Sequence, residues 1–168
     1  YEPIVFPTEY LEMRGPNPMS ESARKRRAVF PSKEAAMWRY ASRPPLNTLR
    51  ADALAGYVNG GFVDLDDGTV PLACLPEYEA RTFECETKMT LERLEGMTTP
   101  IAVAMGTEDG ESSPSEFTPR IAEELVRGSL IEFELLGHFG PQQDPEASSS
   151  SFDSRHYAIL PDLLSSSG

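Results

Sequence analysis

The clearest hydrophobic pattern in the chain is the unbroken apolar run 101–105, which is bounded by Pro100 and Gly106. A short continuous run between two chain breakers is typical of a strand that is buried on both faces of a parallel sheet. We therefore expect a core strand over these residues.

A helix and a second strand are predicted directly after this run. Apolar residues recur at helical spacing over 117–125, with Thr118 as the expected N-cap, and Gly128 follows the last of them. The apolar segment 130–136 then predicts a strand. Strand, helix and strand in succession form a βαβ unit, so the sequence predicts an α/β fold with parallel strands.

The chain between residues 8 and 97 has a different pattern, in which helical periodicity dominates. A helix that begins near Ser32 is expected to place Ala35, Trp38 and either Ala41 or Tyr40 on one side, and a further helix ends at Gly60–Gly61. Four parts are therefore expected: the end of a core strand at 1–7, a helical region at 8–97, the βαβ portion at 98–146 and a serine-rich, weakly ordered tail at 147–168.

Composition limits the partners that this chain can have. The chain carries 27 acidic and 15 basic side chains, a net charge of −12, and 39% hydrophobic residues. This apolar content is sufficient for a core. Phosphate binding needs clustered cations, so we expect neither nucleic acid nor a membrane surface as partner. The one basic cluster, Arg24–Arg27, is interpreted as a solvated helix face rather than an anion site.

The sequence also indicates a soluble, cytoplasmic protein. No apolar stretch approaches the roughly 18 residues that span a bilayer. Cys74 and Cys85 fit neither a metal motif nor a disulfide framework, and we expect both to be reduced thiols.

Two side chains with catalytic potential follow the predicted strands. Asp109 comes shortly after the first strand, and His138 lies in a glycine-rich turn just after the second. In open α/β sheets, the loops at the carboxyl ends of the strands carry the chemistry. A carboxylate that contacts a histidine fixes its tautomer and stabilises the imidazolium, so this pair could act as a general base.

These segments carry a resemblance to a known family. The stretch 100–109 with its acid and the stretch 135–141 with its histidine look like the last part of an α/β-hydrolase fold protein. Residues 1–7 are similar to the sixth strand of such proteins, and residues 8–97 resemble the helical cap over their active site. The resemblance implies a Ser–Asp–His triad with Asp109 as acid and His138 as base.

One departure from the family pattern is decisive for function. The family places its nucleophile in a Gly-x-Ser-x-Gly segment before the cap, and this sequence contains no such segment. The resemblance therefore implies a cap and the carboxyl-terminal half of the fold. The partner would be the amino-terminal half, which would supply the nucleophile.

Other assignments remain open for the acid. Some family members, the haloalkane dehalogenases among them, take the acid from just after the sixth strand, and Glu2 occupies that place here. Glu108 is a third candidate, although we expect it to face solvent. A metal site formed by Asp109, His138 and His156 lacks a known ligand spacing, so we expect neither metal nor cofactor.

The expected activity is that of an esterase-like or lactonase-like hydrolase that acts on a small apolar substrate. Four aromatic residues are candidates for binding it, although aromatic residues in amphipathic helices also form plain core: Trp38, Tyr40, Phe62 and Phe139. The alternative is a non-catalytic fragment or degenerate homologue that serves as a binding or interaction module, in which the acid and the histidine are relics.

Overall fold

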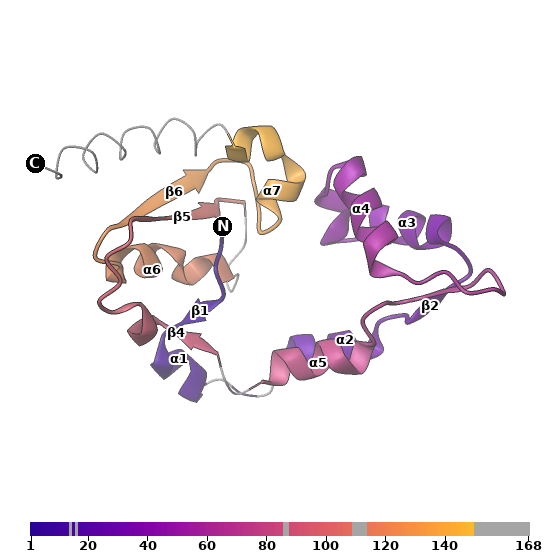
Figure 1. Cartoon of the computed structure of the whole chain (residues 1–168), viewed down its shortest axis with the longest axis horizontal. Helices are drawn as coiled ribbons and strands as arrows, with labels where there is room; N and C mark the ends of the chain where they lie inside the picture. Colours follow the sequence, from indigo (N-terminus) through magenta and orange to yellow (C-terminus); the bar gives the residue numbers. More distant parts are fainter. Residues whose placement is uncertain (14, 16, 86–87, 109–113, 150–168) are drawn as a thin grey trace, which may run out of the picture. The chain divides into compact units, whose positions relative to one another are not determined.

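The computed structural model describes residues 1–13, 15, 17–85, 88–108 and 114–149, and the chain divides into two compact units (Figure 1). The first, which we call the sheet unit, consists of Tyr1–Val5 and Leu91–Gly168. The second, the helical unit, is the continuous segment Phe6–Thr90. In sequence, the helical unit is therefore an insertion within the sheet unit.

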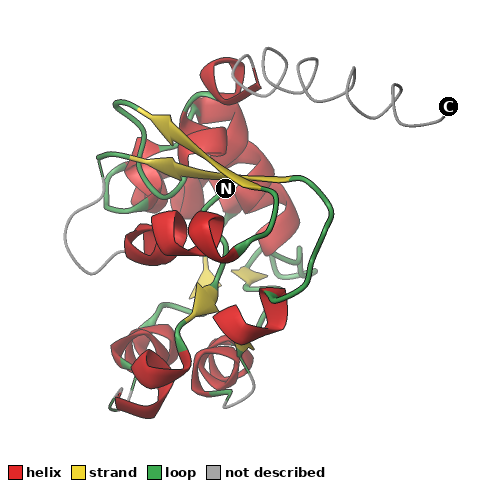
Figure 2. Cartoon of the chain, turned by 90° about the vertical axis from the view of Figure 1, so that its left-hand side faces the viewer, coloured by secondary structure: helices red, strands yellow, loops and turns green. Residues whose placement is uncertain are grey.

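A parallel pair of strands forms the centre of the sheet unit. Strand β5 (Ile101–Gly106) pairs along its whole length with β6 (Gly128–Phe133). The crossover between them contains the 3₁₀ turn η3 (Pro114–Phe117) and helix α6 (Thr118–Glu124). Helix α6 packs against both strands, and Figure 2 shows the two strands side by side. The predicted βαβ unit is confirmed.

Strand β5 is buried on both faces, as its apolar run predicts. Val103 packs against Ile121 of α6 on one face. Ala104 faces the other way and belongs to a cluster with Ile131 and Phe133, against which Tyr1 packs. Because side chains of a strand alternate between its two faces, only a continuous apolar run can satisfy both layers.

Helix α6 begins slightly differently from the expectation. Thr118 is the first helical residue rather than the N-cap, because the turn η3 runs directly into the helix and leaves Phe117 at the cap position. The buried hydroxyl of Thr118 therefore makes no N-cap hydrogen bond, and it has no hydrogen-bond partner within the described part of the chain.

The remaining elements of the sheet unit are short. The sheet unit also contains η2 (Leu91–Leu94) and α7 (Gly140–Gln143), and β1 (Val5–Phe6) lies where the chain leaves it for the helical unit. The amino terminus lies beside β5, where the Glu2 N–H donates to the Ala104 carbonyl at 2.7 Å (Figure 1). Residues 1–5 thus belong to the same compact unit as the βαβ unit.

The helical unit has its own elements and its own core. Phe30, Val58, Phe62 and Val70 are buried together there. Its elements are α1 (Thr8–Met13), α2 (Pro18–Lys25), β2 (Val29–Phe30), α3 (Lys33–Ala41), η1 (Leu46–Thr48), α4 (Ala51–Gly61), β3 (Val70–Pro71), α5 (Pro76–Glu84) and β4 (Met89–Thr90). Strands β2 and β3 pair antiparallel.

Ion pairs join α2 to α5 within the helical unit. Arg24 contacts Glu77 at 2.9 Å and Glu84 at 2.5 Å. Arg26 contacts Glu79 at 2.6 Å. These two guanidinium groups of the basic run are therefore engaged by carboxylates of this same chain. In the described residues, no helix is both long enough and apolar enough to cross a bilayer.

Candidate active site

The candidate site lies at the carboxyl ends of β5 and β6, within the sheet unit. Three segments meet there: Tyr1–Val5 beside β5, the residues that follow β5, and the turn that carries His138 after β6. The Thr107 N–H donates to the Phe133 carbonyl at 3.1 Å, and the Glu108 N–H donates to the Leu136 carbonyl at 2.9 Å. Backbone hydrogen bonds therefore tie the two strand ends together beyond the sheet itself.

Glu2 provides a buried carboxylate at this edge. Its backbone has φ of +39°, in the left-handed region that residues with side chains rarely adopt. Its side chain is 0% exposed. One carboxylate oxygen, Oε1, accepts a hydrogen bond from the Gly106 N–H at 2.9 Å. A buried carboxylate needs such donors, because its transfer from water is otherwise very costly.

The second carboxylate oxygen of Glu2 contacts the candidate base. Oε2 lies 2.6 Å from Nδ1 of His138. When the carboxylate of Glu2 is ionised it only accepts hydrogen bonds, and this contact then requires the proton on Nδ1 and leaves Nε2 as the acceptor. The His138 side chain is 38% exposed, and the Phe139 ring meets the imidazole edge-on at a centroid distance of 5.0 Å. The arrangement can therefore accept a proton at Nε2 and stabilise the resulting imidazolium.

The other acids considered from the sequence have different positions. Asp109, the preferred acid, lies outside the described residues, as does His156. Glu108 is exposed, as expected. Glu2, weighed as the alternative acid, is the carboxylate that contacts His138. The sequence signal for Glu2 was the family resemblance, in which Glu2 occupies the place of an acid just after the sixth strand.

The aromatic candidates for substrate binding are divided between the two units. Phe139 lies against His138 in the sheet unit. Phe62 is part of the buried core of the helical unit, and Tyr40 packs against that core. Trp38 is 78% exposed. Ala36 is the buried residue of α3, so the expected side is wrong for Trp38, whereas Tyr40, an alternative member of that side, packs against the core.

Tyr1 and Gln143 were not among the candidates, although both contact the loop that carries His138. Each makes a side-chain hydrogen bond to Gly137, the residue before the histidine. The sequence gives little indication of their role, because Tyr1 and Gln143 lie far apart in the chain and form no recognisable motif. Within the described residues, no group of three His, Cys, Asp or Glu side chains could hold a metal ion.

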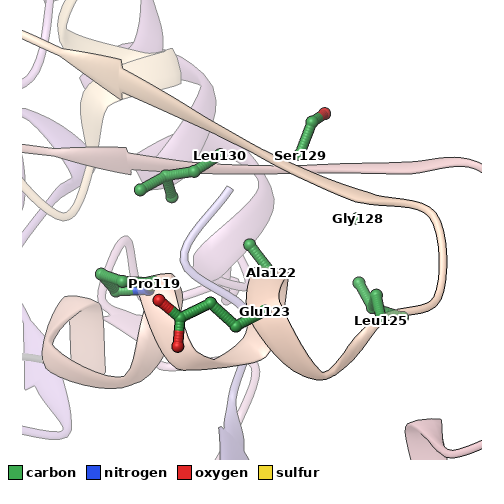
Figure 3. Close-up of a pocket in the computed structure, with 7 residues that line it drawn as sticks. All are labelled: Pro119, Ala122, Glu123, Leu125, Gly128, Ser129 and Leu130. Atoms are coloured by element: carbon green, nitrogen blue, oxygen red, sulfur yellow. The ribbon is translucent and has the colours of Figure 1, made fainter.

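A separate depression of about 350 Å³ lies between α6 and the beginning of β6 (Figure 3). It is lined by Pro119, Ala122, Glu123, Leu125, Gly128, Ser129 and Leu130. It borders the amino end of β6, whereas the Glu2–His138 pair lies at the carboxyl ends of the strands. The depression is therefore not part of the candidate site.

Comparisons with known proteins identify the fold. No protein-family model and no curated protein sequence matches this chain. Among solved structures, the chain is similar to E-2-(acetamidomethylene)succinate hydrolase, with 18% identity and a TM-score of 0.58 over 80% of this chain and 50% of that one. It is also similar to the peroxisomal alpha-beta-hydrolase Lpx1 of Saccharomyces cerevisiae, with 11% identity and a TM-score of 0.69 over 95% of this chain and 45% of that one.

These similarities establish the class of structure. The chain has the α/β-hydrolase fold and spans half or less of the length of the hydrolase structures that it matches. The expectation of a part of this fold is confirmed.

Proposed function

We propose that this chain contributes the acid and the base of a catalytic triad to an α/β-hydrolase of the esterase or lactonase type. The observation that carries the proposal is the 2.6 Å contact between the buried carboxylate of Glu2 and Nδ1 of His138. Both similar structures are named hydrolases, which supports the same reaction class. The position of the pair at the carboxyl ends of parallel strands is the position that the fold uses for chemistry.

The proposed mechanism assigns one role to each side chain. Nε2 of His138 removes the proton from a nucleophile that sequence outside this chain supplies, and later returns it to the leaving group. Glu2 keeps the proton on Nδ1 and stabilises the imidazolium between these two steps. The nucleophile forms a covalent acyl intermediate, which water then hydrolyses. The amino-terminal half of the fold is the partner that this mechanism requires.

The substrate and the compartment belong to the same proposal. We expect a small, largely apolar ester or lactone that needs no cofactor. The Phe139 ring lies against the imidazole of the base, and Phe139 is the first candidate for a substrate contact. Two cysteines are too few for a disulfide framework, so we expect the cytoplasm as the compartment.

The test uses the complete protein encoded by the gene that contains this sequence. We expect the gene to encode a Gly-x-Ser-x-Gly segment ahead of Tyr1, and the purified protein to hydrolyse short-chain p-nitrophenyl esters. His138→Ala and Glu2→Gln are each expected to lower kcat by about 100-fold or more, since a positioned base contributes that much. Glu108→Gln is the matched control and should leave kcat within about twofold, because its side chain faces solvent.

The same measurements distinguish the competing assignments. If Asp109→Asn lowers kcat and Glu2→Gln does not, Asp109 is the acid. Activity that survives His138→Ala overturns the assignment of the base. A folded complete protein without activity on any ester or lactone supports the binding-module alternative instead.

A further inference from the structure

The backbone of Gly137, the residue before His138, is held by two side chains. The Tyr1 hydroxyl donates to the Gly137 carbonyl at 2.6 Å. The Gly137 N–H donates to Oε1 of Gln143 at 2.8 Å. The Gly140 N–H also reaches the Gly137 carbonyl, at 2.8 Å. The donor and the acceptor of this peptide position are thus both occupied, one by the amino-terminal segment and one by α7.

The space for the Tyr1 side chain depends on two glycines. A Cβ atom at Gly106 would lie 2.6 Å from the Tyr1 hydroxyl oxygen, and a Cβ atom at Gly140 would overlap the hydroxyl and the ring. The Tyr1 ring also packs against the Phe133 ring, at a centroid distance of 5.9 Å. Gly106 ends β5 and Gly140 begins α7, so both elements leave room for the same tyrosine.

Two of the residues that contact the histidine loop, Tyr1 and Glu2, are neighbours in the chain. Tyr1 binds the backbone before His138, while Glu2 binds the imidazole itself. The Glu2 N–H is fixed on Ala104 of β5. The Tyr1–Glu2 dipeptide therefore links β5 to the histidine loop through both the Gly137 backbone and the His138 imidazole.

We propose that Tyr1 and Gln143 are positioning residues that hold the His138 loop so that Nδ1 faces Glu2. Glycine has more backbone freedom than other residues, and without these two of the three hydrogen bonds described above only the bond from the Gly140 N–H would restrain the backbone of Gly137. The imidazole would then leave the short contact with Oε2 for part of the time. The proposal rests on the proposed function only in taking His138 as the base.

The experiment measures the Nδ1–H proton of His138 in the complete protein. We expect proton NMR to detect a strongly deshielded Nδ1–H resonance that disappears in His138→Gln and in Glu2→Gln. Tyr1→Phe removes only the hydroxyl, and Gln143→Leu removes only the acceptor. Each is expected to speed exchange of this proton with water by about twofold to tenfold, the range that loss of one hydrogen bond produces.

Conservative and matched variants separate positioning from general destabilisation. Gln143→Glu keeps an oxygen for the Gly137 N–H and should retain slow exchange. Tyr78→Phe removes the hydroxyl of an exposed tyrosine in the helical unit, and Gln142→Leu alters the exposed neighbour of Gln143; neither should change the resonance. Should Tyr1→Phe fail to fold, the comparison of Gln143→Leu with Gln143→Glu decides the outcome.

The outcomes for this proposal and for the proposed function differ. If exchange is unchanged in both Tyr1→Phe and Gln143→Leu while Glu2→Gln abolishes the resonance, the positioning role is overturned and the Glu2–His138 pair stands. If the unmodified protein lacks the resonance, Glu2 is not the partner of His138 and the proposed acid is overturned as well.

Discussion

Glu2 combines an unfavourable backbone conformation with a fully buried charge, and its neighbours offset both. A non-glycine residue in the left-handed region costs on the order of 1–3 kcal/mol. The N–H of Glu2 is bonded to Ala104, and its carboxylate is bonded to Gly106 and His138. The strained residue is the one that carries the proposed acid, and strain of this kind concentrates at functional sites.

Leu135 has the same type of strain without comparable compensation. Its φ is +63°, and the residue is 81% exposed. Leu135→Gly is expected to stabilise the sheet unit by about 0.5–1 kcal/mol, because relief of the left-handed strain exceeds the entropic cost of glycine. The measurement is the urea midpoint of unfolding followed by circular dichroism.

A second exposed apolar residue supplies the control for that change. Val126 is exposed but has no positive φ, so Val126→Gly should destabilise the protein. A lower midpoint for Leu135→Gly than for the unmodified protein would contradict the strain interpretation.

The choice of acid illustrates what a sequence can reveal about a site. His138 was placed at a strand end by its neighbours in the chain, since the apolar runs and glycines around it are local signals. Its contact with Glu2 joins residues 136 positions apart, and no local pattern encodes such a contact. Glu2 could therefore be named only as an alternative, and Tyr1 and Gln143 not at all.

At the scale of elements, β5 and α3 show where periodicity succeeds and where it fails. The apolar run 101–105 is continuous, so it could be assigned as a buried strand without deciding which of its side chains face the core. In α3, the expected side comprised Ala35, Trp38 and either Ala41 or Tyr40. Tyr40 packs against the core together with the buried Ala36, whereas Trp38 is exposed. Residues four apart lie on one face of a helix, and Trp38 falls well off that face.

The α2–α5 pair makes a prediction about pH. Hydrogen bonds from Arg24 lower the pKa of both Glu77 and Glu84 below the ordinary value of 4.5. A carboxyl group with a lowered pKa in the folded state stabilises that state above its unfolded pKa, and the contribution disappears as pH falls through the folded value. Arg24→Gln should therefore lower the melting temperature at neutral pH, and the difference should narrow as pH falls below about 4.5.

Arg27 provides the control for this pH dependence. Its guanidinium lies over the Phe30 ring and donates to the Val29 carbonyl, so its contacts do not depend on a titrating carboxyl group. The effect of Arg27→Gln on the melting temperature should not narrow below pH 4.5 as that of Arg24→Gln does. Parallel pH profiles for the two variants would refute the role of Arg24 in acid sensitivity.

At the scale of the whole molecule, the two units have separate hydrophobic cores. Phe30 is buried in the helical unit, and Ile131 is buried in the sheet unit. Phe30→Ala is expected to cost about 3–5 kcal/mol and Ile131→Ala about 2–5 kcal/mol. Phe30→Ala should therefore accelerate amide hydrogen exchange in residues 6–90, while the amides of β5 and β6 stay protected.

Ile131→Ala is the reciprocal variant. It should accelerate amide hydrogen exchange in β5 and β6 and leave exchange in the helical unit unchanged. The readout is hydrogen exchange followed by mass spectrometry of peptides from each unit. Equal loss of protection in both units after either substitution would mean that they unfold as one cooperative body.

The insertion of the helical unit into the sheet unit also fixes an order of events during synthesis. Tyr1 and Glu2 precede the helical unit, and His138 follows Glu2 by 136 residues. At about 5–20 residues per second, a ribosome needs about 7–27 s to cover that distance. The helical unit is complete in sequence before β5 is made, so its core can form first. A nascent chain that stops short of His138 therefore contains the whole helical unit and Glu2, but lacks the histidine that Glu2 contacts in the complete structure.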